Sequence, residues 1–207
     1  DHCRNVRITD CDIEAGDDAI VIKNTREHAD LGPTENIIVS SCRLVSTSSA
    51  VKLGTESHGA IRNIIVSDCI VEHSHRGLSI QVRDSGPVEN VRFANCRVET
   101  RLFHRGWWGR GEPIYVTALP RHDGDEPPVV RNVTFDGIDC DAEHGVFCVG
   151  TAALPLADIQ LRNIQLRLGR KSRWQAAERD LRPVHSQEHG GLEDDTVDAV
   201  RIEHAAG

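Results

Sequence analysis

The sequence NVRITDC at residues 5–11 returns as NIIVSSC at 36–42, NIIVSDC at 63–69 and NVRFANC at 90–96. Each copy begins with Asn, alternates apolar with polar residues through its middle, and ends with Cys. Weaker copies begin at Asn132 and Asp158, and a degenerate seventh lies near residues 198–202. A repeat with a period of about 20–50 residues indicates a solenoid, in which each unit packs on its neighbours.

A second run begins fourteen residues after each leading Asn, as AIVIK at 19–23, AVKLG at 50–54 and GLSIQ at 77–81. Both runs are rich in Val and Ile and alternate with period two, which is typical of half-buried strands. A unit of 27 to 31 residues without a helix fits one turn of a parallel β-helix, whose coils stack about 4.8 Å apart. We therefore predict an all-β, right-handed parallel β-helix of about seven coils.

Equivalent positions of successive coils should stack on one another. Four of the seven Cys share one position, namely Cys11, Cys42, Cys69 and Cys96. We expect them to form an interior ladder of small apolar side chains rather than disulfides, and their spacing does not fit a zinc site. We expect the leading Asn residues to form a stacked amide ladder at a turn rather than a ligand site.

Composition limits the possible functions. The chain has 207 residues, with 24 Lys and Arg against 32 Asp and Glu, for a net charge of -8. This balance argues against a nucleic-acid binder, and no apolar run is long enough to cross a membrane. We predict a single domain over 1–207, with a groove-side loop at 99–112 and a polar, irregular insertion at 169–195. Because the chain contains no Met, we interpret it as a fragment or processed chain that lacks an N-terminal part.

Adjacent carboxylates stand at Asp17 and Asp18, after Gly16 and just before the first of the second runs. Like charges so close disfavour each other's ionisation, so one can stay an acid near neutrality while the other is a base. Such a pair suits glycosidic bond cleavage, in which one carboxyl protonates the leaving oxygen and another activates water. Taken alone, the pair also fits a turn or a cation-binding role.

Three segments together resemble the polygalacturonases, glycoside hydrolase family 28: DCDIEAGDDAIVIK at 10–23, AVKLGTES at 50–57 and WWGRGEPIY at 107–115. The resemblance covers most of the chain. It implies an inverting hydrolase on a right-handed β-helix, with Asp17 as general acid and Asp18 as one of the residues that activate water. It implies no cofactor and no metal.

The chain departs from the family pattern in three places. The family's Asn-Thr-Asp motif would lie upstream of Asp1. Its Gly-His-Gly histidine corresponds in register to Ser49, whereas His58 falls in the loop after the strand. Its Arg-Ile-Lys motif, which grips the uronate carboxylate, is replaced by Ser79-Ile80-Gln81. Unsubstituted galacturonan is therefore a less secure substrate.

Other side chains are candidates for substrate contacts on the outer face of the second runs. Lys23 and Lys52 should project beside the acidic pair, although each also fits a solvated surface charge. The register stacks Asp18, Ser49 and Arg76 in one column and Asp17, Ser48 and His75 in another. The remaining candidates are Gln81, Trp107, Trp108 and Tyr115. The two Trp suit stacking on sugar rings, or alternatively anchor their loop by burial. The polar insertion holds His185 and His189, for which we predict no zinc site.

The sequence thus favours a carbohydrate-active hydrolase of pectic or related acidic polysaccharide. Two alternatives stay open, a polysaccharide lyase on the same fold and a non-catalytic carbohydrate-binding β-helix. By resemblance we expect a secreted or periplasmic protein that acts as a monomer on a polysaccharide or oligosaccharide.

Overall fold

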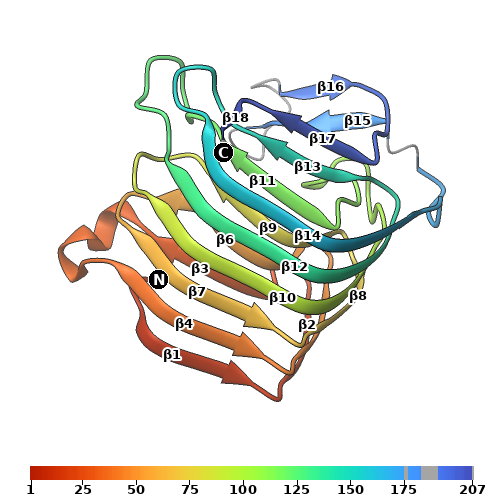
Figure 1. Ribbon diagram of the computed structural model, residues 1–207, viewed down its shortest axis with the longest axis horizontal. Coiled ribbons are helices and arrows are strands. Elements are labelled where there is room, and N and C mark those ends of the chain that lie inside the picture. The colour runs from red at the N-terminus through yellow and green to blue at the C-terminus, as the bar shows by residue number, and fades with distance from the viewer. Residues whose placement is uncertain (175–176, 183–190, 207) are drawn as a thin grey trace.

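The protein is a right-handed parallel β-helix, described here by a computed structural model of residues 1–174, 177–182 and 191–206. One wall is a parallel sheet that winds through seven successive coils of the described chain (Figure 1). Its strands, in spatial order, are β1 (Arg4–Thr9), β4 (Thr34–Ser40), β7 (Ile61–Ser67), β10 (Val88–Thr100), β12 (Val130–Ala142), β14 (Leu156–Leu168) and β18 (Ala205–Ala206). The predicted coil number and strand type are confirmed.

After a sharp corner the same sheet continues on a second leg. In the first three coils this leg consists of separate strands, β2 (Asp12–Ala15), β5 (Arg43–Ser46) and β8 (Ile70–Ser74). In the next three coils, β10, β12 and β14 each run through both legs. The corner residues Asp10, Ser41, Asp68 and Asn95 have φ between 52° and 56°, a left-handed conformation that Asn and Asp tolerate better than most residues.

The second sheet carries the runs that the sequence placed fourteen residues after each Asn. Its parallel strands are β3 (Ile20–Asn24), β6 (Ser49–Ser57), β9 (Arg76–Val82), β11 (Ile114–Ala118), β13 (Val146–Val149) and β17 (Val200–Glu203). Val21 pairs with Lys52 and Lys52 pairs with Ser79, so the predicted register is confirmed. A short 3-10 helix, η1 (Arg26–Leu31), follows β3.

The interior between the sheets is filled by stacked apolar side chains. Cys42, Cys69 and Cys96 are almost fully buried in it, and every Cys is a free thiol. In the next coils Ile138 and Ile164 continue this column. Phe93 and Phe135 stack with their ring centroids 4.7 Å apart. The thiols therefore act as core side chains.

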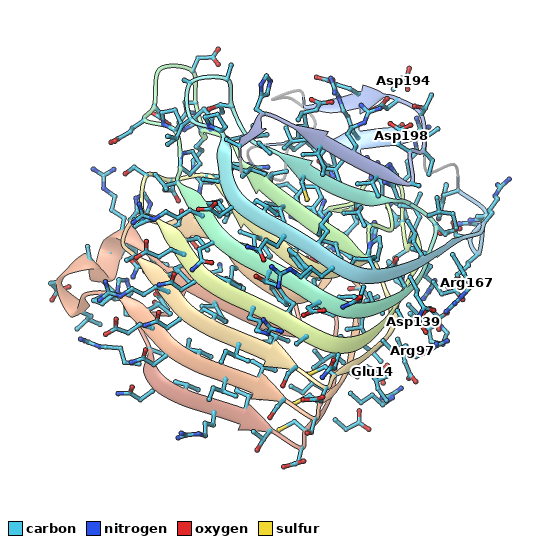
Figure 2. The ribbon with its side chains drawn as sticks, viewed as in Figure 1. Glu14, Arg97, Asp139, Arg167, Asp194 and Asp198 are labelled. Carbon is cyan, nitrogen blue, oxygen red and sulfur yellow. The ribbon has the colours of Figure 1, made fainter. Side chains whose placement is uncertain are left out.

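The Asn ladder forms as expected. Each Asn side chain donates its amide N–H to the side-chain oxygen of the Asn one coil earlier, over 2.7 to 3.2 Å, from Asn36 to Asn132. All five Asn have φ between 53° and 59°. On the outer surface, ion pairs also link neighbouring coils: Asp139 accepts hydrogen bonds from Arg97 at 2.9 Å and from Arg167 at 2.5 Å (Figure 2).

The insertion predicted as irregular at 169–195 contains a two-stranded antiparallel ribbon, β15 (Glu178–Asp180) and β16 (Leu192–Asp194). The prediction of an irregular segment is therefore wrong for these two strands. Each strand is only three residues long, which is too short to show an alternating pattern in the sequence. His185 and His189 lie outside the described residues. Among the described residues, no helix is long and apolar enough to cross a membrane.

Candidate active site

The acidic pair lies at the corner between β2 and β3, at the start of the second sheet. The hydroxyls of Ser46 and Thr47, one coil further on, donate hydrogen bonds to the carbonyl oxygens of Asp17 at 2.6 Å and Gly16 at 2.5 Å. The neighbouring coil thereby holds the backbone of this corner. The stacking of the repeat thus gives the two carboxyl groups a fixed platform.

Asp18 is the nearly buried member of the pair, with 9% of its side chain exposed. Its Oδ2 lies 2.9 Å from Lys52 Nζ, and its Oδ1 accepts hydrogen bonds from Ser48 Oγ at 2.8 Å and from the Ser49 N–H at 3.1 Å. Burial by itself would raise the pKa of Asp18, but the charge of Lys52 and these hydrogen bonds outweigh it and hold the pKa below its ordinary value. Asp18 is therefore an ionised carboxylate at neutral pH.

Asp17 is exposed beside it. Its Oδ1 accepts a hydrogen bond from the Asp18 N–H at 2.8 Å. The corner therefore combines one carboxylate fixed in its charged form with one that solvent or a ligand can reach. Chemically, the first can accept a proton from water and the second can exchange a proton with a bound group.

Lys52 and Ser49 lie where the sequence placed them, next to Asp18. Lys23 instead pairs with Glu56 on the following strand, at 3.1 Å and with about a third of each side chain exposed. His58 lies beyond the far end of β6, where it contacts Asp84 at 3.5 Å. The structure therefore assembles Asp17, Asp18, Ser48, Ser49 and Lys52 at one point and places Lys23 and His58 elsewhere.

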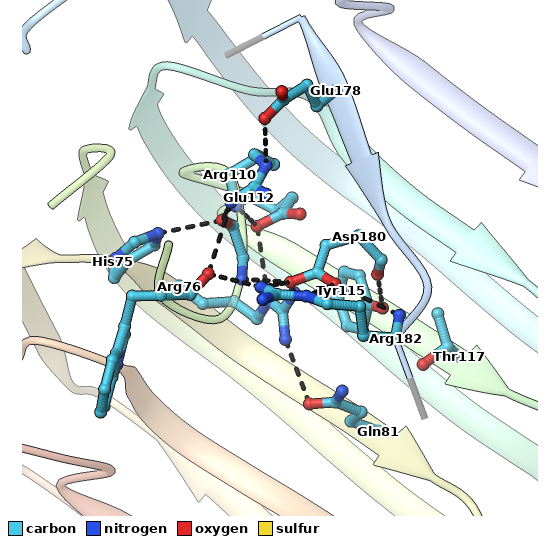
Figure 3. A network of polar contacts seen from close by, with 12 residues as sticks. His75, Arg76, Gln81, Arg110, Glu112, Tyr115, Thr117, Glu178, Asp180 and Arg182 are labelled. Atoms are coloured by element: carbon cyan, nitrogen blue, oxygen red, sulfur yellow. Dashed lines mark hydrogen bonds and ion pairs between the residues drawn. The ribbon is translucent and has the colours of Figure 1, made fainter. Parts of the chain in front are cut away.

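Four predicted substrate contacts are buried instead of lining an open groove. The exposed fraction is 0% for His75 and Tyr115 and 1% for Arg76 and Gln81. Their side chains take part in a network of polar contacts on the outer side of the second sheet (Figure 3). Other parts of the chain cover these four side chains in this structure, so their contact with a substrate stays a prediction.

The network centres on Arg76. Its guanidinium lies 3.5 Å from the centroid of the Tyr115 ring, and it contacts Glu112 at 3.3 Å and Gln81 at 3.2 Å. Asp180 reaches the network from β15: the Tyr115 hydroxyl donates to its carbonyl oxygen at 2.5 Å. The charge of Glu112 and Asp180 counteracts burial, so the pKa of Arg76 stays above its ordinary value.

Two segments form the cover. The loop at 101–113 approaches so closely that a Cβ at Gly109, which has φ 87°, would lie 3.1 Å from Arg76 Nε. The second segment, residues 177–182, contributes Arg182, whose guanidinium lies 5.1 Å from the Trp108 ring centroid and which also donates to the Trp107 carbonyl oxygen at 2.5 Å. Both Trp are half-buried. The groove-side loop is thus anchored to the molecule at its two indole residues.

Several members of this network had no assignment from the sequence. Glu112 lies inside the GRGEP stretch, so its acidic character within an apolar context was a usable signal. Asp180 and Arg182 lie in the polar insertion, where nothing in the repeat register marks them.

His75 is a neutral member of the network. Burial lowers the pKa of His75 to about 4, so its imidazole is neutral at physiological pH. Its Nε2 donates a hydrogen bond to the Gly109 carbonyl oxygen at 3.0 Å. No group of three or more metal-ligating side chains occurs in the part of the chain that the structure describes.

Comparison with known proteins supports the architecture. No protein-family model matches the chain, and no curated protein matches its sequence. Three chains among the solved structures match. One of them is a hyperthermoactive exopolygalacturonase from Thermotoga maritima, with a TM-score of 0.59 and 21% sequence identity. The match covers 80% of this chain and 37% of that enzyme's chain. The two chains share the β-helix fold.

Proposed function

We propose that this protein is a glycoside hydrolase that cleaves pectic or related acidic polysaccharide by an inverting acid/base mechanism. One observation carries the proposal: an exposed carboxyl, Asp17, lies directly beside a carboxylate, Asp18, that Lys52 keeps ionised at 2.9 Å. Different environments for two neighbouring acids are what glycoside hydrolysis requires. The shared fold with an exopolygalacturonase adds support.

In this mechanism Asp17 donates its proton to the glycosidic oxygen as that bond breaks. Asp18 is one of the groups that take a proton from the water attacking the anomeric carbon on the opposite face. Lys52 keeps Asp18 in its basic form, and the Ser48 hydroxyl and the Ser49 N–H orient its Oδ1. We also propose a setting outside the cytoplasm, because polymeric sugars are met there.

A non-catalytic carbohydrate-binding role is the second candidate. The observation that favours it is the burial of Arg76 and Gln81, which withdraws two predicted contacts from a substrate at Asp17. Binding of a glycan by both the unaltered chain and Asp17→Asn, without product from either, would support this role.

The test is product release from polygalacturonan, rhamnogalacturonan and neutral glycans, with reducing ends and ultraviolet absorbance followed together. The hydrolase proposal predicts new reducing ends without an unsaturated product, and a loss of about 10²–10⁴-fold in Asp17→Asn. Asp30→Asn is the matched control, because Asp30 is an exposed carboxylate on η1. Unsaturated product would indicate a lyase instead, and equal rates in Asp17→Asn and Asp30→Asn would remove Asp17 from the mechanism.

A further inference from the structure

Ser46 is a buried serine at the end of β5, one coil beyond the acidic corner, with an exposed fraction of 1%. It pairs with Ala15, two residues before Asp17, across the parallel sheet. Its Oγ lies 2.6 Å from the Asp17 carbonyl oxygen and 2.9 Å from the backbone nitrogen of Ser48. One side chain thus contacts both the residue proposed as the acid and a residue that holds the base.

The partners of Ser46 fix the direction of both hydrogen bonds. A carbonyl oxygen can only accept and a backbone N–H can only donate, whereas a serine hydroxyl can do both. Ser46 therefore donates its one hydroxyl proton to Asp17 and accepts a hydrogen bond from Ser48. A single orientation of this hydroxyl satisfies both neighbours at once.

Through Ser48 this arrangement reaches Asp18. The Ser48 hydroxyl donates to Asp18 Oδ1 at 2.8 Å, and the Ser49 N–H donates to the same oxygen at 3.1 Å. The Ser46 hydroxyl holds the backbone N–H of Ser48 and hence the start of the segment that carries both donors. A displacement of that segment would weaken both bonds to Asp18, because hydrogen bonds weaken steeply as their geometry is distorted.

Ser46 is itself held by the following coil. Its backbone N–H donates to Ser74 Oγ at 3.0 Å, and its carbonyl oxygen accepts from the His75 N–H at 3.1 Å. The buried Ser74 hydroxyl donates in turn to the Glu72 carbonyl oxygen at 3.2 Å. Ser46 is thus part of a hydrogen-bonded stack of three coils, and groups built on such elements are held more precisely than groups on loops.

We propose that Ser46 is a positioning residue of the active site, whose single hydroxyl sets the backbone of Asp17 and, through Ser48, the orientation of Asp18. The inference rests on the proposed function and deepens it, because it adds a group that fixes the acid relative to the base. Glycoside hydrolysis depends on the relative placement of two carboxyl groups, and a misplacement of about 1 Å can cost about 10²-fold in rate. Loss of this hydroxyl should therefore affect catalysis more than substrate binding.

Ser57 offers the matched control. Its exposed fraction is 0%, and its hydroxyl donates to the Asp84 carbonyl oxygen, one coil further on, at 3.0 Å. It lies at the end of β6 opposite to Ser49 and thus away from the acidic corner. Ser57→Ala therefore removes the same kind of buried hydrogen bond as Ser46→Ala, without a contact to Asp17 or Asp18.

The first readout is kinetic, on a glycan that the unaltered protein cleaves. Ser46→Ala should lower kcat by about 10–10²-fold and leave KM within about twofold, whereas Ser57→Ala should leave both unchanged. Ser46→Cys keeps a weak donor at the same position, so it should recover part of the loss, and it keeps the test valid if Ser46→Ala does not fold. A loss of kcat no larger than that of Ser57→Ala, or a rise in KM at constant kcat, would overturn the proposal.

The second readout needs no substrate. Carbon-13 NMR of the Asp18 carboxyl group follows its titration, which the hydrogen bonds from Ser48 and Ser49 help to hold below 3.8. In Ser46→Ala the midpoint should rise by about half a pH unit, and in Ser57→Ala it should stay where it is. An unchanged midpoint in Ser46→Ala would overturn the positioning role. A raised midpoint in a protein that cleaves no glycan would support this role while the hydrolase proposal fails, so the two failures are distinguishable.

Discussion

Two zones on the outer side of the second sheet are built from the same columns of the repeat but have opposite access to solvent. At the β3 end, Asp18 and Lys52 form a pair whose neighbour Asp17 is exposed. Two and three coils further on, Arg76 and Tyr115 are covered by the loop at 101–113 and by residues 177–182. The difference shows that the repeat decides which way a side chain points, whereas the insertions decide whether anything can reach it.

The largest effect is expected in the covered zone. Glu112→Gln removes the carboxylate beside Arg76 and leaves a buried, uncompensated guanidinium. We expect the free energy of unfolding to fall by about 3–5 kcal/mol, measured by urea denaturation. Asp30→Asn should change it little. A loss as small as that of Asp30→Asn would mean that the covered zone is open to water in solution.

A smaller effect is expected for the pair at the accessible corner. Lys52→Met should lower the free energy of unfolding by about 1–3 kcal/mol at pH 7, because Asp18 loses its cation. The lowered pKa of Asp18 stabilises the folded state above its ordinary value of 3.8, and this contribution disappears as the pH falls through the lowered pKa. The difference between the two proteins should therefore shrink in acid. A difference that stays constant from pH 7 to pH 2 would contradict the pairing.

The framework that supports both zones should respond more weakly. Asn63→Ala removes two ladder hydrogen bonds and places Ala at φ 58°, so we expect a loss of about 1–2 kcal/mol in the free energy of unfolding. Asn63→Gly tolerates this φ and should recover part of the loss in thermal denaturation. If Gly and Ala were equivalent, the backbone conformation would not contribute.

The smallest effect is expected at Lys23. Its pair with Glu56 is about one-third exposed on each side, so Lys23→Met should change the free energy of unfolding by less than about 1 kcal/mol. Thermal denaturation of Lys23→Met and Lys52→Met compares the loss of stability when the same substitution breaks an exposed ion pair and a buried one. Equal losses would erase the distinction between the two lysines.

The sequence was sufficient to predict the coils, the two ladders and the register, because these follow from period and alternation alone. It also predicted the contact of Ser49 and Lys52 with Asp18, since stacked positions lie one strand apart. It did not predict the burial of His75, Arg76, Gln81 and Tyr115. Their cover comes from the loop at 101–113 and from residues 177–182, which lie outside the repeat, where no periodicity links them to the sheet.

Nor did the sequence mark Arg83 as unusual. A lone arginine after a strand normally lies at the surface, whereas Arg83 is 1% exposed and donates hydrogen bonds to the Thr117 hydroxyl and the Arg182 carbonyl oxygen. Recognition of such a position depends on counting buried charges in three dimensions. The repeat register contains no information of that kind.

The most direct test of the account is the stereochemistry of the first product, followed by proton NMR on the polysaccharide that releases reducing ends. If Asp17 and Asp18 act as acid and base, an α-linked substrate should give the β-anomer before mutarotation, and Asp17→Asn should give no product on the same time scale. Initial formation of the α-anomer, an unsaturated end, or no product on any acidic glycan would contradict the account.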